Sequence, residues 1–229
     1  MLLGLQKLTL LDYPGVVACT LFSSGCNFSC PFCHNASLAK GGIQEGFLSE
    51  DEVLAFLKKR SGLLDGVCLT GGEFLLHKES PALISAIKDL GYKVKLDTNG
   101  AFPEVLAELL EEKKLDYVAM DIKNSPEKYA LTSGNEKCLP LVEKSVEILL
   151  KGKVAYEFRT TVTGSLHCRE DFFAIGEWIR GAEKYFLQPF ADSGDVLFND
   201  PAYAVSNGQM AEYLAIMKEF VPSSAIRGR

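Results

Sequence analysis

Apolar and polar positions along the chain follow two periods that alternate nearly to its end. Short apolar runs rich in β-branched residues are typical of buried strands, and apolar residues recurring every three to four positions are typical of amphipathic helices. The predicted strands are residues 16–22, 66–70, 92–97, 116–123, 154–162 and 184–189. The predicted helices are one that begins at Ser49, then residues 80–90, 103–113, 139–151, 171–180 and about 207–221.

Local signals mark several helix ends. Ser49 is followed three residues later by Glu52, which is the pattern of a capping box. Pro81 stands at the first position of its predicted helix, and Gly91 follows the last apolar position of the same helix. The second predicted helix is therefore bounded on both sides by residues that favour those ends.

Strict alternation of strands and helices predicts an α/β fold with a parallel sheet and right-handed crossovers. A doubly wound open sheet and a partial barrel both satisfy this pattern, and periodicity does not choose between them. Residues 1–15 read as a short N-terminal segment before the first predicted strand. No linker, repeat or low-complexity stretch interrupts the pattern, so we expect a single domain over residues 1–229.

Composition narrows the function classes. Of the 229 residues, 47% are hydrophobic and 24% charged, and the formal net charge of −6 argues against a basic nucleic-acid-binding surface. No apolar stretch is long enough to span a bilayer, and residues 1–7 lack the pattern of a signal peptide. Seven cysteines, an odd number, do not suggest a disulfide framework. We therefore expect a cytoplasmic protein that binds neither nucleic acid nor a membrane.

Three of these cysteines lie close together, directly after the first predicted strand. Cys26, Cys30 and Cys33 have the spacing C-x3-C-x2-C. Three thiolates on one loop can converge on a soft metal centre, whereas tetrahedral zinc and a fully ligated four-iron cluster each take four protein ligands. A four-iron cluster on this loop would leave one iron open. An incomplete zinc knuckle, or three reduced thiols, is the alternative interpretation.

Other polar groups fall where predicted strands end, which is where parallel α/β folds collect ligand-binding residues. Gly71-Gly72-Glu73 follows the second predicted strand, and Asp97-Thr98-Asn99-Gly100 follows the third. Asp121-Ile122-Lys123 ends the fourth, and Gln188 lies at the end of the sixth. Arg159 lies inside the fifth predicted strand, where a charged side chain needs a partner.

The cysteine spacing, together with these motifs in this order, resembles the radical S-adenosylmethionine (SAM) superfamily. The resemblance implies an incomplete, TIM-like (β/α)6 barrel with parallel strands and its site at the carboxyl ends of the strands. It implies that Cys26, Cys30 and Cys33 hold a [4Fe-4S] cluster whose open iron binds SAM. Reductive cleavage of SAM would then give a 5′-deoxyadenosyl radical that removes hydrogen from a substrate.

The same resemblance assigns roles to the strand-end motifs. Gly71, Gly72 and Glu73 match the stretch that binds the SAM amine, with Phe74 where the family has proline. Asp97 and Asp121 match carboxylates beside SAM and a monovalent cation, and Lys123 matches a SAM-site lysine. For Arg159 we expect as partner the SAM carboxylate, Glu73 or Glu157. Further residues expected at the SAM site are Phe32, Asn99 and Gln188.

Finer features resemble activating proteins of the anaerobic ribonucleoside-triphosphate reductase. They are Leu11-Asp12-Tyr13-Pro14-Gly15, the Cys-His-Asn end of the cysteine loop and Arg159-Thr160-Thr161-Val162. Phe32 and Ala191 stand where the pyruvate formate-lyase activator has tyrosine and histidine. The implied substrate is one glycine Cα–H of that reductase, a glycyl radical enzyme, and the implied electron donor is of flavodoxin or ferredoxin type.

Three alternatives remain open at this point. The chain could be a pyruvate formate-lyase-type activator, or a radical SAM enzyme acting on a small molecule, such as a 7-carboxy-7-deazaguanine synthase-like enzyme. It could also be a non-catalytic zinc or iron–sulfur module. SAM cleavage, and sensitivity of that cleavage to changes at Glu73, distinguish the last alternative from the first two.

Overall fold

The computed structural model describes residues 1–43, 45–192, 194–198 and 200–228. Within them, nine strands form one sheet in the order β3-β1-β2-β4-β5-β6-β7-β8-β9. The strands are β1 Leu2–Thr9, β2 Ala18–Ser23, β3 Leu48–Ser49, β4 Gly66–Gly71, β5 Lys93–Thr98, β6 Tyr117–Asp121, β7 Ala155–Val162, β8 Tyr185–Pro189 and β9 Ala225–Ile226.

All six predicted strands are present, as β2 and β4–β8, and neighbours among them pair in parallel. Their ends differ from the predicted ones by at most two residues. Successive positions of these strands are buried, for example Val67, Cys68 and Leu69 of β4. This burial explains why apolar runs located the strands so well.

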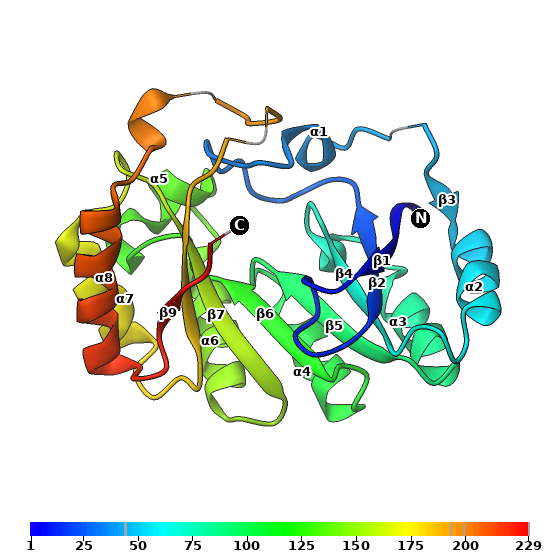
Figure 1. Ribbon diagram of the computed structural model, residues 1–229. Helices are drawn as coiled ribbons and strands as arrows, with labels where there is room; N and C mark the ends of the chain where they lie inside the picture. The colour runs from blue at the N-terminus through cyan, green and yellow to red at the C-terminus, as the bar shows by residue number, and fades with distance from the viewer. Residues whose placement is uncertain (44, 193, 199, 229) are drawn as a thin grey trace.

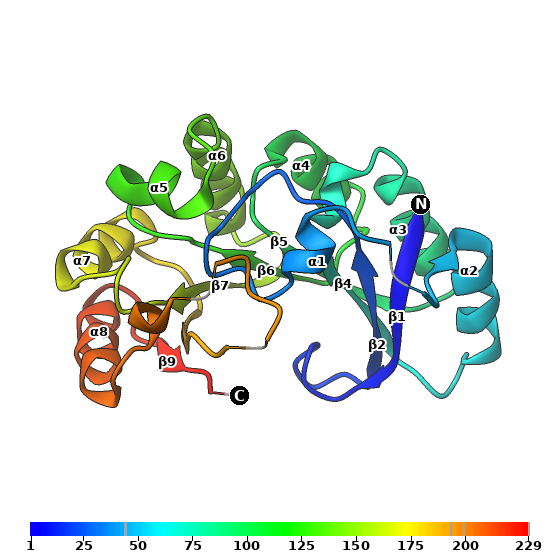
Figure 2. The same cartoon turned by 90° about the horizontal axis from the view of Figure 1, so that it is seen from above.

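The larger helices follow the predicted alternation. They are α2 Glu50–Lys59, α3 Ser80–Asp89, α4 Pro103–Glu111, α6 Leu139–Leu150, α7 Arg169–Trp178 and α8 Asn207–Phe220. Figure 2 shows them in an arc around the outside of the curved sheet. The capping box that begins α2 is confirmed, since Ser49 Oγ accepts from Glu52 N at 3.3 Å and Glu52 Oε2 accepts from Ser49 N at 2.8 Å.

The sheet is not closed, because β3 and β9 are its two edges. With the helices outside and a cavity inside, the architecture is a partial barrel with mostly parallel strands, and not a doubly wound sheet with helices on both faces (Figures 1 and 2). No helix among the described residues has the length and apolar character needed to cross a bilayer.

Several elements differ from the sequence-based expectation. Residues 1–15 were interpreted as a short N-terminal segment with no strand assigned, but β1 lies there and pairs antiparallel with β2, and β3 adds antiparallel to β1. Leu3 and Thr9 are the buried residues of β1, so the strand carries no clean alternation. The short elements β9, α1 (Ala36–Ala39) and α5 (Tyr129–Ser133) were also missed, because each is shorter than a readable period.

Candidate active site

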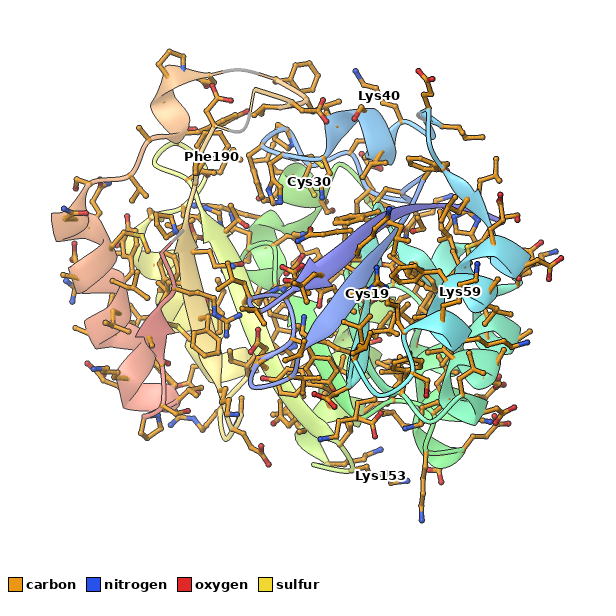
Figure 3. The ribbon with its side chains drawn as sticks, turned by 45° about the vertical axis from the view of Figure 1, so that its right-hand side comes forward. Cys19, Cys30, Lys40, Lys59, Lys153 and Phe190 are labelled. Carbon is orange, nitrogen blue, oxygen red and sulfur yellow. The ribbon has the colours of Figure 1, made fainter. Side chains whose placement is uncertain are left out.

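A cavity of about 460 Å³ lies at the carboxyl ends of the parallel strands, a size typical of small-molecule sites. Its walls come from the loop that carries the three cysteines and from β2 and β4–β8. Figure 3 shows Cys30 and Phe190 at this end of the molecule, and Lys153, just before β7, at the opposite end. The cavity is therefore where residues at strand ends converge.

Backbone hydrogen bonds fasten the cysteine loop, residues 24–35, to the end of α5 and to residues 197–198. Ser29 N donates at 2.8 Å to the backbone O of Ser133, which is the last residue of the short helix α5. On the other side, Leu197 N donates to Cys33 O at 3.1 Å and Phe198 N to Pro31 O at 3.0 Å. The loop is thus positioned by tertiary contacts and not by its own sequence alone.

The three thiols lie near one another in a largely buried setting. Burial raises the pKa of Cys30 to about 12, a rise that Lys123 opposes and the neighbouring Cys26 and Cys33 increase. Burial also raises the pKa of Cys26. Three thiolates at this position therefore require a positive centre to offset their charge.

A [4Fe-4S] cluster fits this donor set, because cysteine thiolates are its usual ligands and each binds a different iron. The described residues contain no group of three His, Cys, Asp or Glu side chains arranged around one metal ion. The three cysteines all line the cavity. The cavity beside them leaves room for a further ligand on a cluster held there.

Gly71 ends β4, Gly72 follows it, and both line the cavity. A Cβ on Gly72 would lie 2.0 Å from Gly25 O, and Gly71 has φ 120°. Glu73 N donates to Gly25 O at 2.9 Å, so the end of β4 is held directly against the start of the cysteine loop. Glycine is required here because any side chain would separate these two segments.

Glu73 is buried beneath the cavity and is not part of its lining. Its carboxylate accepts from Leu75 N at 3.1 Å, Thr98 Oγ1 at 3.0 Å and Asn99 N at 2.7 Å. Burial raises the pKa of Glu73 to about 7, against the lowering effect of these three donors. The carboxylate thus ties the end of β4 to the end of β5, and its expected contact with the SAM amine stays a prediction.

A network of alternating charges crosses three neighbouring strands. Arg159 Nε donates to Asp121 Oδ1 at 2.7 Å and Arg159 Nη1 to Asp97 Oδ2 at 3.1 Å. Lys123 Nζ is 2.9 Å from Asp121 Oδ2, and the buried Lys95 pairs with Asp97. The prediction that Glu73 or Glu157 is the partner of Arg159 was wrong, because its ion pairs are with Asp97 and Asp121.

Strand register explains this pairing. Asp121 on β6 lies directly opposite Arg159 on β7, so the two side chains leave the sheet together. Burial would raise the pKa of Asp121, but Arg159 and Lys123 hold it well below its usual range. Asp121 is therefore a permanent anion, and Arg159 and Lys123 are permanent cations beside the cavity.

The structure brings together every predicted site residue except Glu73 in the lining of this one cavity. The residues are Cys26, Cys30, Phe32, Cys33, Gly71, Gly72, Asp97, Asn99, Asp121, Lys123, Arg159 and Gln188. Phe32 is buried and packs edge-on against Tyr203, with ring centroids 6.5 Å apart. The set spans the cysteine loop and five strands, β4–β8, so it mixes thiol, carboxylate, cationic and aromatic groups.

Sequence reasoning missed other lining residues. Asp12 reaches the cavity and accepts from Thr20 Oγ1 at 2.6 Å; its only signal was the motif around Tyr13. Leu197 also lines the cavity, and nothing in its sequence context indicated this. His167 was also missed. It does not line the cavity, but its Nε2 lies 3.0 Å from Lys123 O and so supports the Lys123 backbone.

Residues 20–161, more than half of the chain, match the family described as the radical SAM superfamily. This chain belongs to the radical SAM superfamily. The match spans the cysteine loop and every strand-end motif from β2 to β7. The chain is accordingly an enzyme of radical chemistry whose family uses a [4Fe-4S] cluster and SAM.

Two relatives align over most of the chain. A "putative glycyl-radical enzyme activating enzyme" of Methanocaldococcus jannaschii is 30% identical, covering 98% of this chain and 94% of its own. The pyruvate formate-lyase-activating enzyme of Clostridium pasteurianum is 28% identical, covering 83% of this chain and 82% of its own. The alignments thus extend well beyond the cysteine loop.

Among solved structures, Streptococcus suis SuiB bound to S-adenosylmethionine superposes with a TM-score of 0.67 at 10% identity. The overlap covers 90% of this chain and 48% of that one, so this chain spans about half the length of SuiB. At this identity the likeness establishes the fold alone. The shared fold covers nearly all of this chain.

Proposed function

We propose that this radical SAM enzyme activates a glycyl radical enzyme by removing one glycine Cα hydrogen. The observation that carries the proposal is the cavity itself, where three thiols on one loop face the charged ends of β5, β6 and β7. The proposal draws further support from a relative with an activating-enzyme name that aligns with 98% of this chain. Residues 1–229 would act as one radical SAM domain.

In this proposal Cys26, Cys30 and Cys33 hold the [4Fe-4S] cluster, and the cavity beside them holds SAM. When bound, the cluster and SAM supply the one-electron chemistry that hydrogen abstraction needs. The chain's own residues orient SAM and exclude water. The half-buried thiols and the buried Cys30 keep solvent from the cluster side of the cavity.

The strand-end residues bind the polar end of SAM in this proposal. Gly71 and Gly72 present backbone without side chains, and Glu73 fixes the segment that they belong to. Arg159 and Lys123 supply permanent positive charge toward the SAM carboxylate, held in place by Asp97 and Asp121. A monovalent cation beside these two aspartates is a further proposed component.

Remaining proposed contacts of SAM come from three residues of the cavity wall, Phe32, Asn99 and Gln188. Phe32 offers an apolar surface, and Gln188 offers an amide at the end of β8. These groups suit the nucleoside and sulfonium parts of SAM, which combine apolar and polar surface.

For the partner we propose the anaerobic ribonucleoside-triphosphate reductase, with a flavodoxin- or ferredoxin-type electron donor in a reducing cytoplasm. The support is the motif Leu11-Asp12-Tyr13-Pro14-Gly15, whose Asp12 reaches the cavity, and Arg159-Thr160-Thr161-Val162, which supplies two lining residues. The alternatives are a pyruvate formate-lyase partner, supported by the Clostridium relative, and a small-molecule substrate.

The deciding experiment mixes the reduced, reconstituted protein anaerobically with SAM and a candidate reductase and records electron paramagnetic resonance (EPR). A glycyl doublet on the reductase is expected. Cys30→Ala is the control, and it should abolish the iron chromophore and the doublet together. Formation of 5′-deoxyadenosine without any doublet would point to a different substrate, and no SAM cleavage at all would refute the radical function.

A further inference from the structure

Asn99 follows the end of β5 beside the cysteine loop, and its backbone N–H and both side-chain polar atoms form hydrogen bonds. Its backbone N donates to Glu73 Oε2 at 2.7 Å, and its side-chain Oδ1 accepts from Ala101 N at 3.0 Å. Its Nδ2 lies 2.8 Å from Asn27 Oδ1 and 3.8 Å from Cys26 Sγ. The residue is 6% exposed, so these contacts are shielded from water.

This hydrogen-bond pattern fixes the orientation of the carboxamide. The N–H of Ala101 requires an oxygen at Oδ1, and the acceptor oxygen of Asn27 requires the amino group at Nδ2. A flipped amide would place donor against donor and acceptor against acceptor. One N–H of Asn99 therefore faces Asn27, and the other is left to face the sulfur of Cys26.

An N–H group directed at a cluster thiolate changes the electron affinity of the cluster. Reduction adds negative charge, and a donor at the sulfur stabilises the reduced form more than the oxidised form. Phe28 N also donates to Cys26 Sγ, at 3.4 Å, but it belongs to the loop itself. Asn99 directly follows strand β5, far from the loop in sequence, so its contact depends on the fold.

We infer that Asn99 is a positioning residue that raises the reduction potential of the cluster by donating a hydrogen bond to the Cys26 thiolate. The inference rests on the proposed function in one respect, namely that Cys26 is a cluster ligand. It gives Asn99 a role toward the cluster in addition to the SAM contact proposed for it. Glu73 supports the role at one remove, because its carboxylate holds the Asn99 backbone.

The test uses the full chain, reconstituted anaerobically, without SAM and without a partner enzyme. The midpoint potential of the cluster is measured by EPR-monitored redox titration in the wild type, Asn99→Ala and Asn99→Asp. Loss of the N–H should move the midpoint to a more negative value in Asn99→Ala. A carboxylate facing the thiolate in Asn99→Asp, which nearly keeps the side-chain shape, should move it further in the same direction.

The matched control is Asn135→Ala. Asn135 Nδ2 also fastens the cysteine loop, donating to Asn27 O at 3.1 Å, but none of its hydrogen bonds within the described part of the chain reaches a sulfur of that loop. This variant should keep the wild-type potential. An unchanged potential in Asn99→Ala, or an equal shift in Asn135→Ala, would overturn the inference.

A second measurement needs no variant and covers the case in which the Asn99 variants fail to load iron. Wild-type protein labelled with ¹⁵N only in asparagine should show a ¹⁵N coupling to the reduced cluster in pulsed EPR. The absence of that coupling overturns the inference. A wild type that does not hold about four iron atoms per chain refutes the proposed cluster instead, so the two failures are distinct.

Discussion

At the scale of single residues, Arg159 is the centre of the charge network in the cavity wall. One guanidinium holds two carboxylates from two other strands, and its side chain is only 14% exposed. Buried ions are tolerated when they are paired and hydrogen-bonded, and removing one partner leaves the others with their full desolvation cost. Arg159 therefore stabilises both Asp97 and Asp121 as anions, together with Lys95 on the first and Lys123 on the second.

Changing Arg159 to Leu should lower the free energy of unfolding by about 3 kcal/mol, the lower end for a broken buried pair, because the partly buried Asp97 and Asp121 lose a shared partner and keep only Lys95 and Lys123. Urea unfolding of the cluster-free protein measures this loss. Lys144→Met is the control, since Lys144 pairs with Glu104 at 3.5 Å on the surface and should change stability by about 0–1 kcal/mol. Equal effects of the two changes would contradict the account of the charge network.

His167 predicts a pH dependence. Its Nδ1 accepts from Thr163 N at 3.2 Å, so its Nε2 carries the proton that faces Lys123 O, and burial lowers its pKa from 6.5. The unfolded chain binds a proton near pH 6.5 and the folded chain resists it, so this contribution to stability is present above pH 6.5 and is lost as pH falls.

The measurement is urea unfolding of the wild type and His167→Gln above and below pH 6.5. The wild type should lose more stability on acidification than the variant, because only the wild type carries the titrating group. A difference between the two proteins that does not depend on pH would show that His167 is not held neutral.

At the scale of elements, the two-residue strand β9 positions the partner of a buried carboxylate. It brings Arg227 to the fully buried Glu157, with Nη1–Oε1 at 2.6 Å and Nη2–Oε2 at 2.9 Å. Tyr117 Oη donates to the same carboxylate at 2.7 Å, and the guanidinium lies 3.7 Å above the Phe186 ring. The chain end thus neutralises a charge inside the sheet.

Arg227→Ala should lower the free energy of unfolding by about 3 kcal/mol, the lower end for a broken buried pair, because Arg227 is itself 34% exposed. Burial would raise the pKa of Glu157, and Arg227 and Tyr117 hold it below its usual value, so the unpaired variant should take up a proton more readily. A double-mutant cycle with Glu157→Gln isolates the pair. Additive effects of the two changes would mean that the pair contributes no coupling.

At the scale of the whole molecule, the hydrophobic core extends far beyond the cysteine loop, although Phe28, Cys30 and Phe32 of that loop belong to it. The main apolar cluster spans the parallel strands and the outer helices, from Leu21 and Leu69 through Val118 to Phe172 and Met217. The cysteine loop lies over the carboxyl end of this core, fastened by backbone hydrogen bonds to α5 and to residues 197–198. The fold therefore has its own source of stability.

Iron removal should consequently leave the barrel folded. After anaerobic chelation, far-ultraviolet circular dichroism and cooperative urea unfolding should be retained, while residues 24–35 become more open to proteolysis. The loop loses the centre that offsets three thiolates, whereas the sheet loses nothing. Collapse of the cooperative transition on chelation would show instead that the cluster is part of the core.

The predictable features were those set by burial along one strand or helix. Apolar runs such as residues 66–70 marked strands because both faces of a parallel sheet are covered, and Ser49 with Glu52 marked a helix start. The candidate site followed from position, because polar residues after successive parallel strands must meet at one edge. Strand β1 was not predicted because it is half exposed. Leu197 was not predicted as a lining residue because its position depends on contacts with a distant loop.

The amino-acid sequence by itself determined the parallel strands, the cysteine spacing and the order of the strand-end motifs, since each depends on neighbours a few residues apart. Only the tertiary structure decided which charges pair. Arg159 binds Asp97 and Asp121, and Glu157 binds Arg227, because strand register and the path of the chain end set those distances. The tertiary structure also decided the contacts of Glu73, whose carboxylate accepts from three donors and does not line the cavity. Those donors converge on it only when β4 and β5 lie side by side.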